Sequence, residues 1–206
     1  WEDENLDAIL ETWFSGTMSG PALTDILFGD ANPSGKISMS FPRNVGQVPI
    51  YYNHKNTGRP PEASEKYRSK YLDVSNDPLY PFGYGLSYTN FSYGPLKLSK
   101  RELSPGQTLT ASISVGNSGD RDGAEIVQLY TQDLLGSISR PVKELKGFQK
   151  IFLKAGETKI VEFKISSEDL RFYNSDLKFV SEPGDFKVFV GSNSRDLKEA
   201  EFSLLK

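Results

Sequence analysis

The second half of the chain alternates apolar and polar residues with a period of two, and no other feature restricts the fold as strongly. The alternating stretches are TLTASISV (108–115), IVEFKI (160–165), DFKVFV (185–190) and EFSLL (201–205). Successive side chains of a β-strand point to opposite faces, so these stretches are predicted to be half-buried strands. AEIVQLY (124–130) is apolar on both faces, which is typical of a central strand.

Turn-forming pairs separate these stretches. Pro105-Gly106, Asn117-Ser118-Gly119, Ala155-Gly156 and Pro183-Gly184 lie between the apolar runs, and such residues favour turns. Short strands at this spacing indicate a β-sandwich of about seven strands. Residues 166–169 are predicted to form a short helical turn between two strands.

The first half follows a different pattern. Apolar residues at i, i+3 and i+4 predict helices over 5–14 and 19–28, and KISMSF (36–41) predicts a short strand. Residues 42–94 are rich in Pro, Gly, Asn and Tyr and have no sustained period. Two helices and one strand cannot build an independent core. The first half is therefore either the end of a larger α/β domain, which we favour, or a segment that docks on the sandwich.

Composition excludes several kinds of site. The 206 residues contain no cysteine and one histidine, His54, which excludes a disulfide framework and argues against a His-based metal cluster. A net charge of −3 argues against nucleic acid as a partner. No apolar run approaches the ~20 residues of a membrane span. We therefore expect no membrane insertion. The chain opens with acidic residues, so we expect no signal peptide within it. We also expect no cofactor.

A few residues in the irregular region are candidates for contact with a ligand or with another domain. His54 and Arg59 lie in YYNHKNTGRP, and Tyr67 follows in a tyrosine-rich stretch. Loops often carry binding residues. The alternative is structural, because buried tyrosine rings commonly fix irregular loops. Trp13 has the same two interpretations: a platform for a sugar ring, or part of an apolar helix stripe.

YPFGYG (80–85) is predicted to be an ordered linker. Its glycines permit unusual backbone angles, and its aromatic rings can clamp two domains together. The sandwich half contains no tryptophan, and its aromatic residues are mostly Phe at inward positions of the alternation. This pattern argues against a free-standing carbohydrate-binding module, which needs exposed flat rings.

Four long motifs resemble a known family in their order and spacing. They are FGDANPSGKISMSFPRNVGQVPIYYNHKNTGRP (28–60), PLYPFGYGLSYTNF (78–91), SRPVKELKGFQKIFLKAGET (139–158) and EPGDFKVFVGSNSRD (182–196). Together they resemble the C-terminal region of the family 3 glycoside hydrolases, and in particular the bacterial periplasmic β-glucosidases. The resemblance implies an α+β chain: the incomplete end of an α/β sandwich domain (1–80), a linker (81–92) and an all-β fibronectin type III-like sandwich (93–206).

The resemblance also implies a function for the parent enzyme, which is hydrolysis of terminal non-reducing β-D-glucosyl residues with retention. Such chemistry needs two carboxylates about 5 to 5.5 Å apart. In the family these are an Asp on a barrel and a Glu upstream of a motif that stands here as Trp13-Phe14-Ser15-Gly16. Neither carboxylate motif occurs in the chain, so we assign no catalytic residue and expect the chain alone to be inactive.

The partners implied by the resemblance are a β-glucoside or oligosaccharide substrate and the barrel and α/β segments of the parent enzyme. The implied location is the periplasm. Residues alone leave one alternative open, a stand-alone carbohydrate- or protein-binding β-sandwich module.

Overall fold

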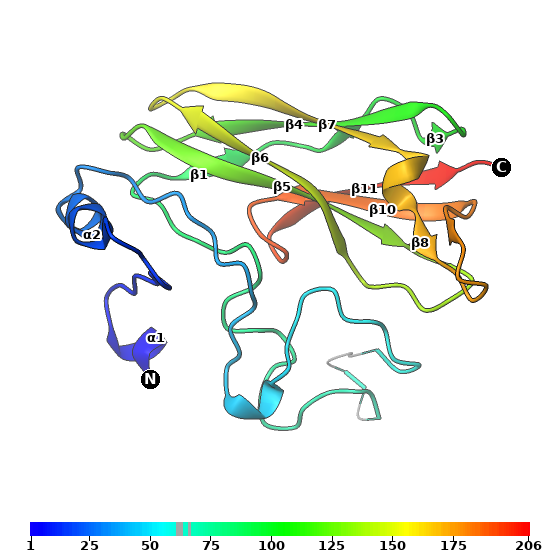
Figure 1. Ribbon diagram of the computed structural model, residues 1–206, viewed down its shortest axis with the longest axis horizontal. Coiled ribbons are helices and arrows are strands. Elements are labelled where there is room, and N and C mark those ends of the chain that lie inside the picture. Colours follow the sequence, from blue (N-terminus) through cyan, green and yellow to red (C-terminus); the bar gives the residue numbers. More distant parts are fainter. Residues whose placement is uncertain (61–63, 66) are drawn as a thin grey trace.

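The computed structural model describes residues 1–60, 64–65 and 67–206. Its helices are α1 (Glu2–Asn5) and α2 (Ser19–Phe28), with short 3-10 helices η1 (Val45–Gln47) and η2 (Ser167–Leu170). Its strands are β1 (Phe91–Tyr93), β2 (Lys97–Leu98), β3 (Glu102–Leu103), β4 (Thr108–Asn117), β5 (Gly123–Asp133), β6 (Glu144–Leu153), β7 (Thr158–Ser166), β8 (Phe172–Tyr173), β9 (Phe179–Val180), β10 (Gly184–Gly191) and β11 (Leu197–Leu204). Figure 1 shows the strands gathered in a sandwich and the first 80 residues running beside it as helices and long loops.

The sandwich consists of two sheets that enclose one apolar core. In one sheet β1 and β2 pair with β4, and β7 pairs with β4 along its length. In the other sheet the order is β3-β11-β10-β5-β6, and every pairing is antiparallel except that of β3 with β11. Strands β8 and β9 form a separate ribbon.

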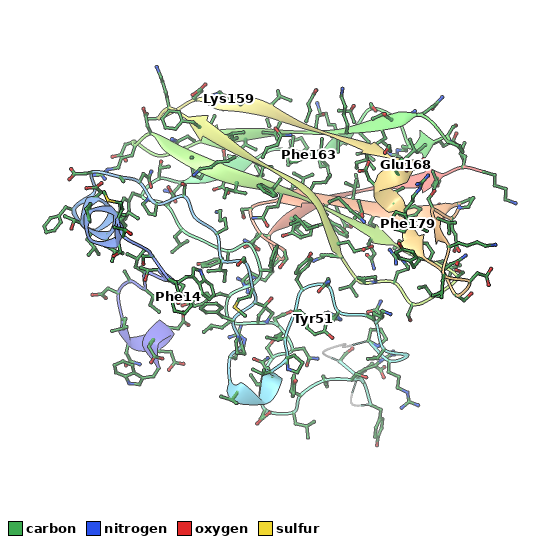
Figure 2. The ribbon with its side chains drawn as sticks, viewed as in Figure 1. Phe14, Tyr51, Lys159, Phe163, Glu168 and Phe179 are labelled. Carbon is green, nitrogen blue, oxygen red and sulfur yellow. The ribbon has the colours of Figure 1, made fainter. Side chains whose placement is uncertain are left out.

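The predicted alternation is confirmed in every stretch that carried it. The inward residues are buried, and they are Leu109, Ala111, Ile113, Val115, Val161, Phe163, Ile165, Phe186, Val188, Val190, Phe202 and Leu204. Figure 2 shows Phe163 within the sandwich. AEIVQLY lies in β5, which is flanked by β10 and β6, so the central position is also confirmed. Burying one such side chain stabilises the fold by about 1.5–3 kcal/mol.

The turns predicted at Pro105-Gly106 and Ala155-Gly156 are confirmed, whereas the turn predicted at Asn117-Ser118-Gly119 starts within β4, whose last residue is Asn117. Gly106 and Gly156 occupy turns with positive φ angles of 74° and 75°. The helical turn after β7 is η2, which Ser166 and Asp169 close with a reciprocal capping box. Pro183-Gly184 is not a turn, because Gly184 already pairs with Leu204 as the first residue of β10.

Predictions for the first half are only partly confirmed. Helix α2 spans the expected residues and ends at Gly29, whose φ of 83° is left-handed. The helix predicted over 5–14 is wrong, since α1 ends at Asn5 and residues 6–14 are not helical. Trp13 has a φ of 48°, which an α-helix does not accommodate. Its ring packs edge-on against Phe41 instead of completing a helical stripe.

The strand predicted over 36–41 is also wrong, because only Phe41 forms a bridge, with Tyr80. The segment is extended and runs beside the linker. The Ile37 amide donates to the Tyr84 carbonyl at 2.9 Å, and the Gly83 amide donates to the Ile37 carbonyl at 2.8 Å. These bonds tie the first half to the linker, and through it to the sandwich.

The first half leaves many apolar side chains exposed. Phe14, Leu27 and Phe28 are 104%, 69% and 81% exposed, and α2 has no fully buried residue. In Figure 2 Phe14 lies on the first half, outside the sandwich. None of the helices in the described residues has the length and apolar character of a membrane span.

Candidate functional site

The candidate residues belong to loops that lie beside the sandwich. His54 lines a surface pocket of about 630 Å³, together with residues of the 47–57 and 69–77 segments. Two exposed rings, Tyr51 and Tyr71, contribute to the lining, and Figure 2 shows Tyr51 in this loop region. The pocket is therefore aromatic at two points and otherwise mostly polar.

The structure does not bring all three predicted candidates into this pocket. Arg59 is exposed, and its carbonyl accepts a hydrogen bond from the Ser69 amide at 3.0 Å. Tyr67 is 74% exposed. In the described part of the chain neither residue lines the pocket that contains His54. The three residues share a loop region rather than a single cavity.

Tyr52 holds the loop against the sandwich. Its ring stacks on Phe82 at 4.5 Å between centroids and lies edge-on to Tyr130 at 5.6 Å. Its hydroxyl accepts a hydrogen bond from the Leu145 amide at 3.3 Å. Tyr52 thus fits the structural interpretation of the tyrosines, and it fixes the chain two residues before His54.

The linker is clamped by a buried glutamine. Gln128 in β5 is 3% exposed, and its amide nitrogen donates to the carbonyls of Gly83 (3.1 Å) and Ser192 (2.7 Å). Its amide oxygen accepts from the hydroxyl of Tyr130, and burial raises the pKa of that phenol. Since every polar atom of the Gln128 amide has a partner, the backbone at Gly83 is fixed against β5.

An ion pair forms a second clamp. The Lys36 ammonium lies 3.0 Å from the Glu125 carboxylate and donates to the Gly85 carbonyl at 2.9 Å. Burial raises the pKa of Glu125, and the Lys36 charge opposes that shift. Burial and the nearby Glu125 also raise the pKa of Tyr93. The first half, the linker and the sandwich are therefore joined at this buried ion pair, through Lys36, Gly85 and Glu125.

The described lining of the pocket does not contain the pair of carboxylates that glycoside hydrolysis needs. Asp77 is the single carboxylate among its described lining residues, whereas the reaction needs two. Across the described residues no group of three or more His, Asp or Glu side chains converges as a metal site requires. The geometry fits contact with a polar ligand or with another part of a larger protein.

Sequence reasoning missed the clamping residues. Glu125 and Gln128 both interrupt the apolar run of β5, and each is nearly fully buried. A buried carboxylate or amide requires a hydrogen-bonded partner. A polar residue within the apolar run of β5 could therefore have predicted a buried hydrogen bond. The spacing of residues in the sequence does not identify the partner, such as Lys36.

Two family models match the chain. The model described as the glycosyl hydrolase family 3 C-terminal domain matches residues 1–88, and a fibronectin type III-like domain matches residues 125–194.

Among curated proteins, a periplasmic β-glucosidase of Salmonella typhimurium is 55% identical over 206 residues, which are 99% of this chain and 27% of that protein. A β-xylosidase of Formosa agariphila is 44% identical over 98% of this chain and 27% of its own length. The crystal structure of a β-glucosidase from Listeria innocua in complex with glucose matches with a TM-score of 0.93 and 48% identity, over 99% of this chain and 29% of that one. The chain thus spans less than a third of the length of each of these relatives.

Proposed function

Because the chain belongs to glycoside hydrolase family 3 and corresponds to its C-terminal region, we propose that it is the non-catalytic C-terminal part of a retaining β-glucosidase. The proposed reaction is hydrolysis of terminal non-reducing β-D-glucosyl residues. The observation that carries the proposal is the identity shared along the whole chain with a periplasmic β-glucosidase. We propose the periplasm as the location of the parent enzyme, and the likeness to a periplasmic β-glucosidase supports this proposal.

The proposed division of the chain is 1–80 for the end of the α/β domain, 81–92 for the linker and 93–206 for the sandwich. The distribution of the core supports this division. The buried core cluster draws its residues from 103–204, and the half-buried residues packed against it begin at Phe91.

The proposed role of the sandwich is to hold the first half in place for the rest of the enzyme. The Lys36–Glu125 pair and the Gln128 amide support this role, because both connect the first half or the linker to β5. The exposed apolar residues of the first half, such as Phe14 and Phe28, are the surface that the remaining α/β domain and the barrel would cover.

The pocket beside His54 is proposed to face either the substrate or the barrel. Its two exposed tyrosine rings and polar lining fit a sugar, which presents both apolar C–H faces and hydroxyl groups. We propose the same alternatives for Arg59 and Tyr67, whose exposed side chains extend from the same loops.

One observation favours a second candidate, a binding module. Most aromatic rings of the sandwich are buried, as expected, but Phe148 and Phe152 in β6 and Tyr173 and Phe179 in the β8–β9 ribbon are exposed. Tyr173 and Phe179 lie 4.9 Å apart and are 63% and 51% exposed. Figure 2 shows Phe179 at the edge of the sandwich.

The experiment measures hydrolysis of 4-nitrophenyl β-glucoside and β-xyloside by the longer protein and follows the anomer of the first product by NMR. The proposal expects the glucoside to be preferred and the β-anomer to appear first. Inversion, or preference for the xyloside, would overturn it. Retention of the isolated chain on insoluble glucan would favour the binding module.

A further inference from the structure

We propose that Arg140 is a positioning residue: it holds the β5–β6 loop (134–143) in the form that seats residues 52–55, and so His54, beside the pocket. The expected effect of Arg140 on substrate binding rests on the function proposed above. The effect on the loop does not, since it follows from contacts within this chain.

Arg140 is the buried centre of the loop. Its side chain is 10% exposed. The guanidinium Nη2 donates to Glu144 at 2.7 Å, and Nε lies 3.6 Å from the carboxylate of Asp133. The same group lies over the ring of Phe172, 4.1 Å from its centroid. One cation thus joins the end of β5, the start of β6 and the β8–β9 ribbon.

The loop is packed tightly around this side chain. A Cβ at Gly136 would lie 2.8 Å from Cγ of Arg140 and 3.0 Å from Oδ2 of Asp133, so the backbone approaches both residues closely. Asp133 Oδ1 accepts the Leu135 amide at 3.1 Å. Ser137 donates to Glu182 through its amide at 2.8 Å and through its hydroxyl at 2.6 Å. These contacts give the loop a fixed shape despite its position outside the sheets.

The far side of the loop pairs with the segment that carries His54. The Val142 amide donates to the His54 carbonyl at 2.9 Å, and Pro141 forms a bridge with Lys55. Val142 is two residues after Arg140. Just beyond, the Leu145 amide donates to the Tyr52 hydroxyl. Residues 52–55 are therefore held along their length by the chain that Arg140 anchors.

Removing the guanidinium has a defined consequence. Asp133 has 5% of its side chain exposed and would lose its cation, and a buried carboxylate without a counter-charge is destabilising. The end of β5 and the loop would rearrange to bring water to Asp133. The hydrogen bond from Val142 to His54 would then open more often, because its donor is close to the disturbed residue.

The experiment compares Arg140→Met, Arg140→Lys and the control Arg171→Met in the full-length enzyme. Arg171 is also paired with a glutamate, Glu168, but on the exposed surface of η2. The first readout is hydrogen exchange of the Val142 amide. We expect exchange to be about tenfold faster in Arg140→Met, less accelerated in Arg140→Lys and unchanged in the control. Equal exchange in all variants would overturn the proposal. If Arg140→Met does not fold, Arg140→Lys answers the same question, since it keeps the charge and loses the planar fork.

The second readout separates positioning from general damage to the enzyme. We expect KM for 4-nitrophenyl β-glucoside to rise about fivefold in Arg140→Met while kcat stays within about twofold, with partial recovery in Arg140→Lys. Faster exchange at Val142 with unchanged KM would overturn the substrate role of the His54 loop and leave its attachment by Arg140 supported. The two proposals therefore fail in distinguishable ways.

Discussion

The ammonium of Lys36 lies 3.0 Å from the carboxylate of Glu125, and the two side chains are only 11% and 5% exposed. Lys36 belongs to the segment after α2, whereas Glu125 belongs to β5, which lies between β10 and β6 in its sheet. Because a buried charge without a partner is destabilising, this pair couples the placement of the first half to the stability of β5.

Breaking that pair should be strongly destabilising. We expect Lys36→Met or Glu125→Gln to lower the free energy of unfolding by about 3 kcal/mol, since each leaves the other group buried and unpaired. The double variant Lys36→Met/Glu125→Leu should lose less than the sum of the single variants. Urea denaturation in a double-mutant cycle measures the coupling.

The partly exposed pair of Lys187 with Glu199, in which Lys187 also contacts Glu201, provides the control for this cycle. These atoms lie 3.5 Å apart with 27% and 59% of the side chains exposed, and such a pair contributes about 1 kcal/mol or less. Equal effects at both pairs would contradict a special role for Lys36 and Glu125.

Gly83→Ala should lower the stability of the fold more than the same substitution at another glycine with a left-handed backbone conformation. Gly83 has a φ of 80°, and a Cβ there would lie 2.1 Å from Oε1 of Gln128. Left-handed strain of about 1–2 kcal/mol would add to about 1–3 kcal/mol of overpacking. Thermal unfolding measures the total.

Gly106→Ala is the matched variant, because Gly106 has a φ of 74° and no atom within 4 Å of the added Cβ. It should show the backbone strain alone. A loss of stability at Gly106 as large as that at Gly83 would mean that the contact with Gln128 has no consequence.

Tyr80 should titrate at unusually high pH. Its hydroxyl donates to Asp3, and this hydrogen bond, followed by burial, raises the pKa of Tyr80 from 10.0 to about 12. A group whose pKa is raised on folding contributes stability below its unfolded pKa and loses that contribution as the pH rises. The affected window is therefore pH 10 to about 12.

The measurement for Tyr80 is the ultraviolet absorbance difference between the protein and its Tyr80→Phe variant across this window. Asp3→Asn should return the midpoint of the Tyr80 signal towards 10.0, because it removes the negative charge that opposes ionisation. A midpoint near 10 in the unaltered protein would show that the contact with Asp3 does not form in solution.

The exposed apolar side chains of the first half should make the isolated chain associate. Phe14, Leu27 and Phe28 are all largely exposed, and exposed large apolar side chains favour contact between molecules. Replacing the three with Ser should reduce association, as measured by light scattering, and change the unfolding free energy by about 0.5 kcal/mol or less. Leu72→Ser, at a residue 94% exposed in another loop, should have no effect on association.

The sandwich was predictable because its signal is local. The alternation of Leu109, Ala111, Ile113 and Val115 determines which face of β4 is buried, and no distant residue is needed to see it. Helix α2 was predictable for a similar reason, since its stripe and Gly29 both lie within a few turns.

The failures in the first half arise from contacts that local patterns do not contain. An apolar stripe forms a stable helix only when it packs against a partner, because isolated helices of this length are marginal. The large apolar side chains of residues 6–14 are all exposed in the described structure, whereas Leu23 and Ile26 of α2 are half-buried. The clamps were not predictable either, because Lys36 and Glu125 are 89 residues apart in sequence.

The most direct test of the central claim is hydrolysis of 4-nitrophenyl β-glucoside by the isolated 206-residue chain. The account predicts no release of nitrophenol above buffer, with activity present when the same assay uses the longer protein. Turnover by the isolated chain would contradict it, because the chain itself would then have to contain both catalytic carboxylates.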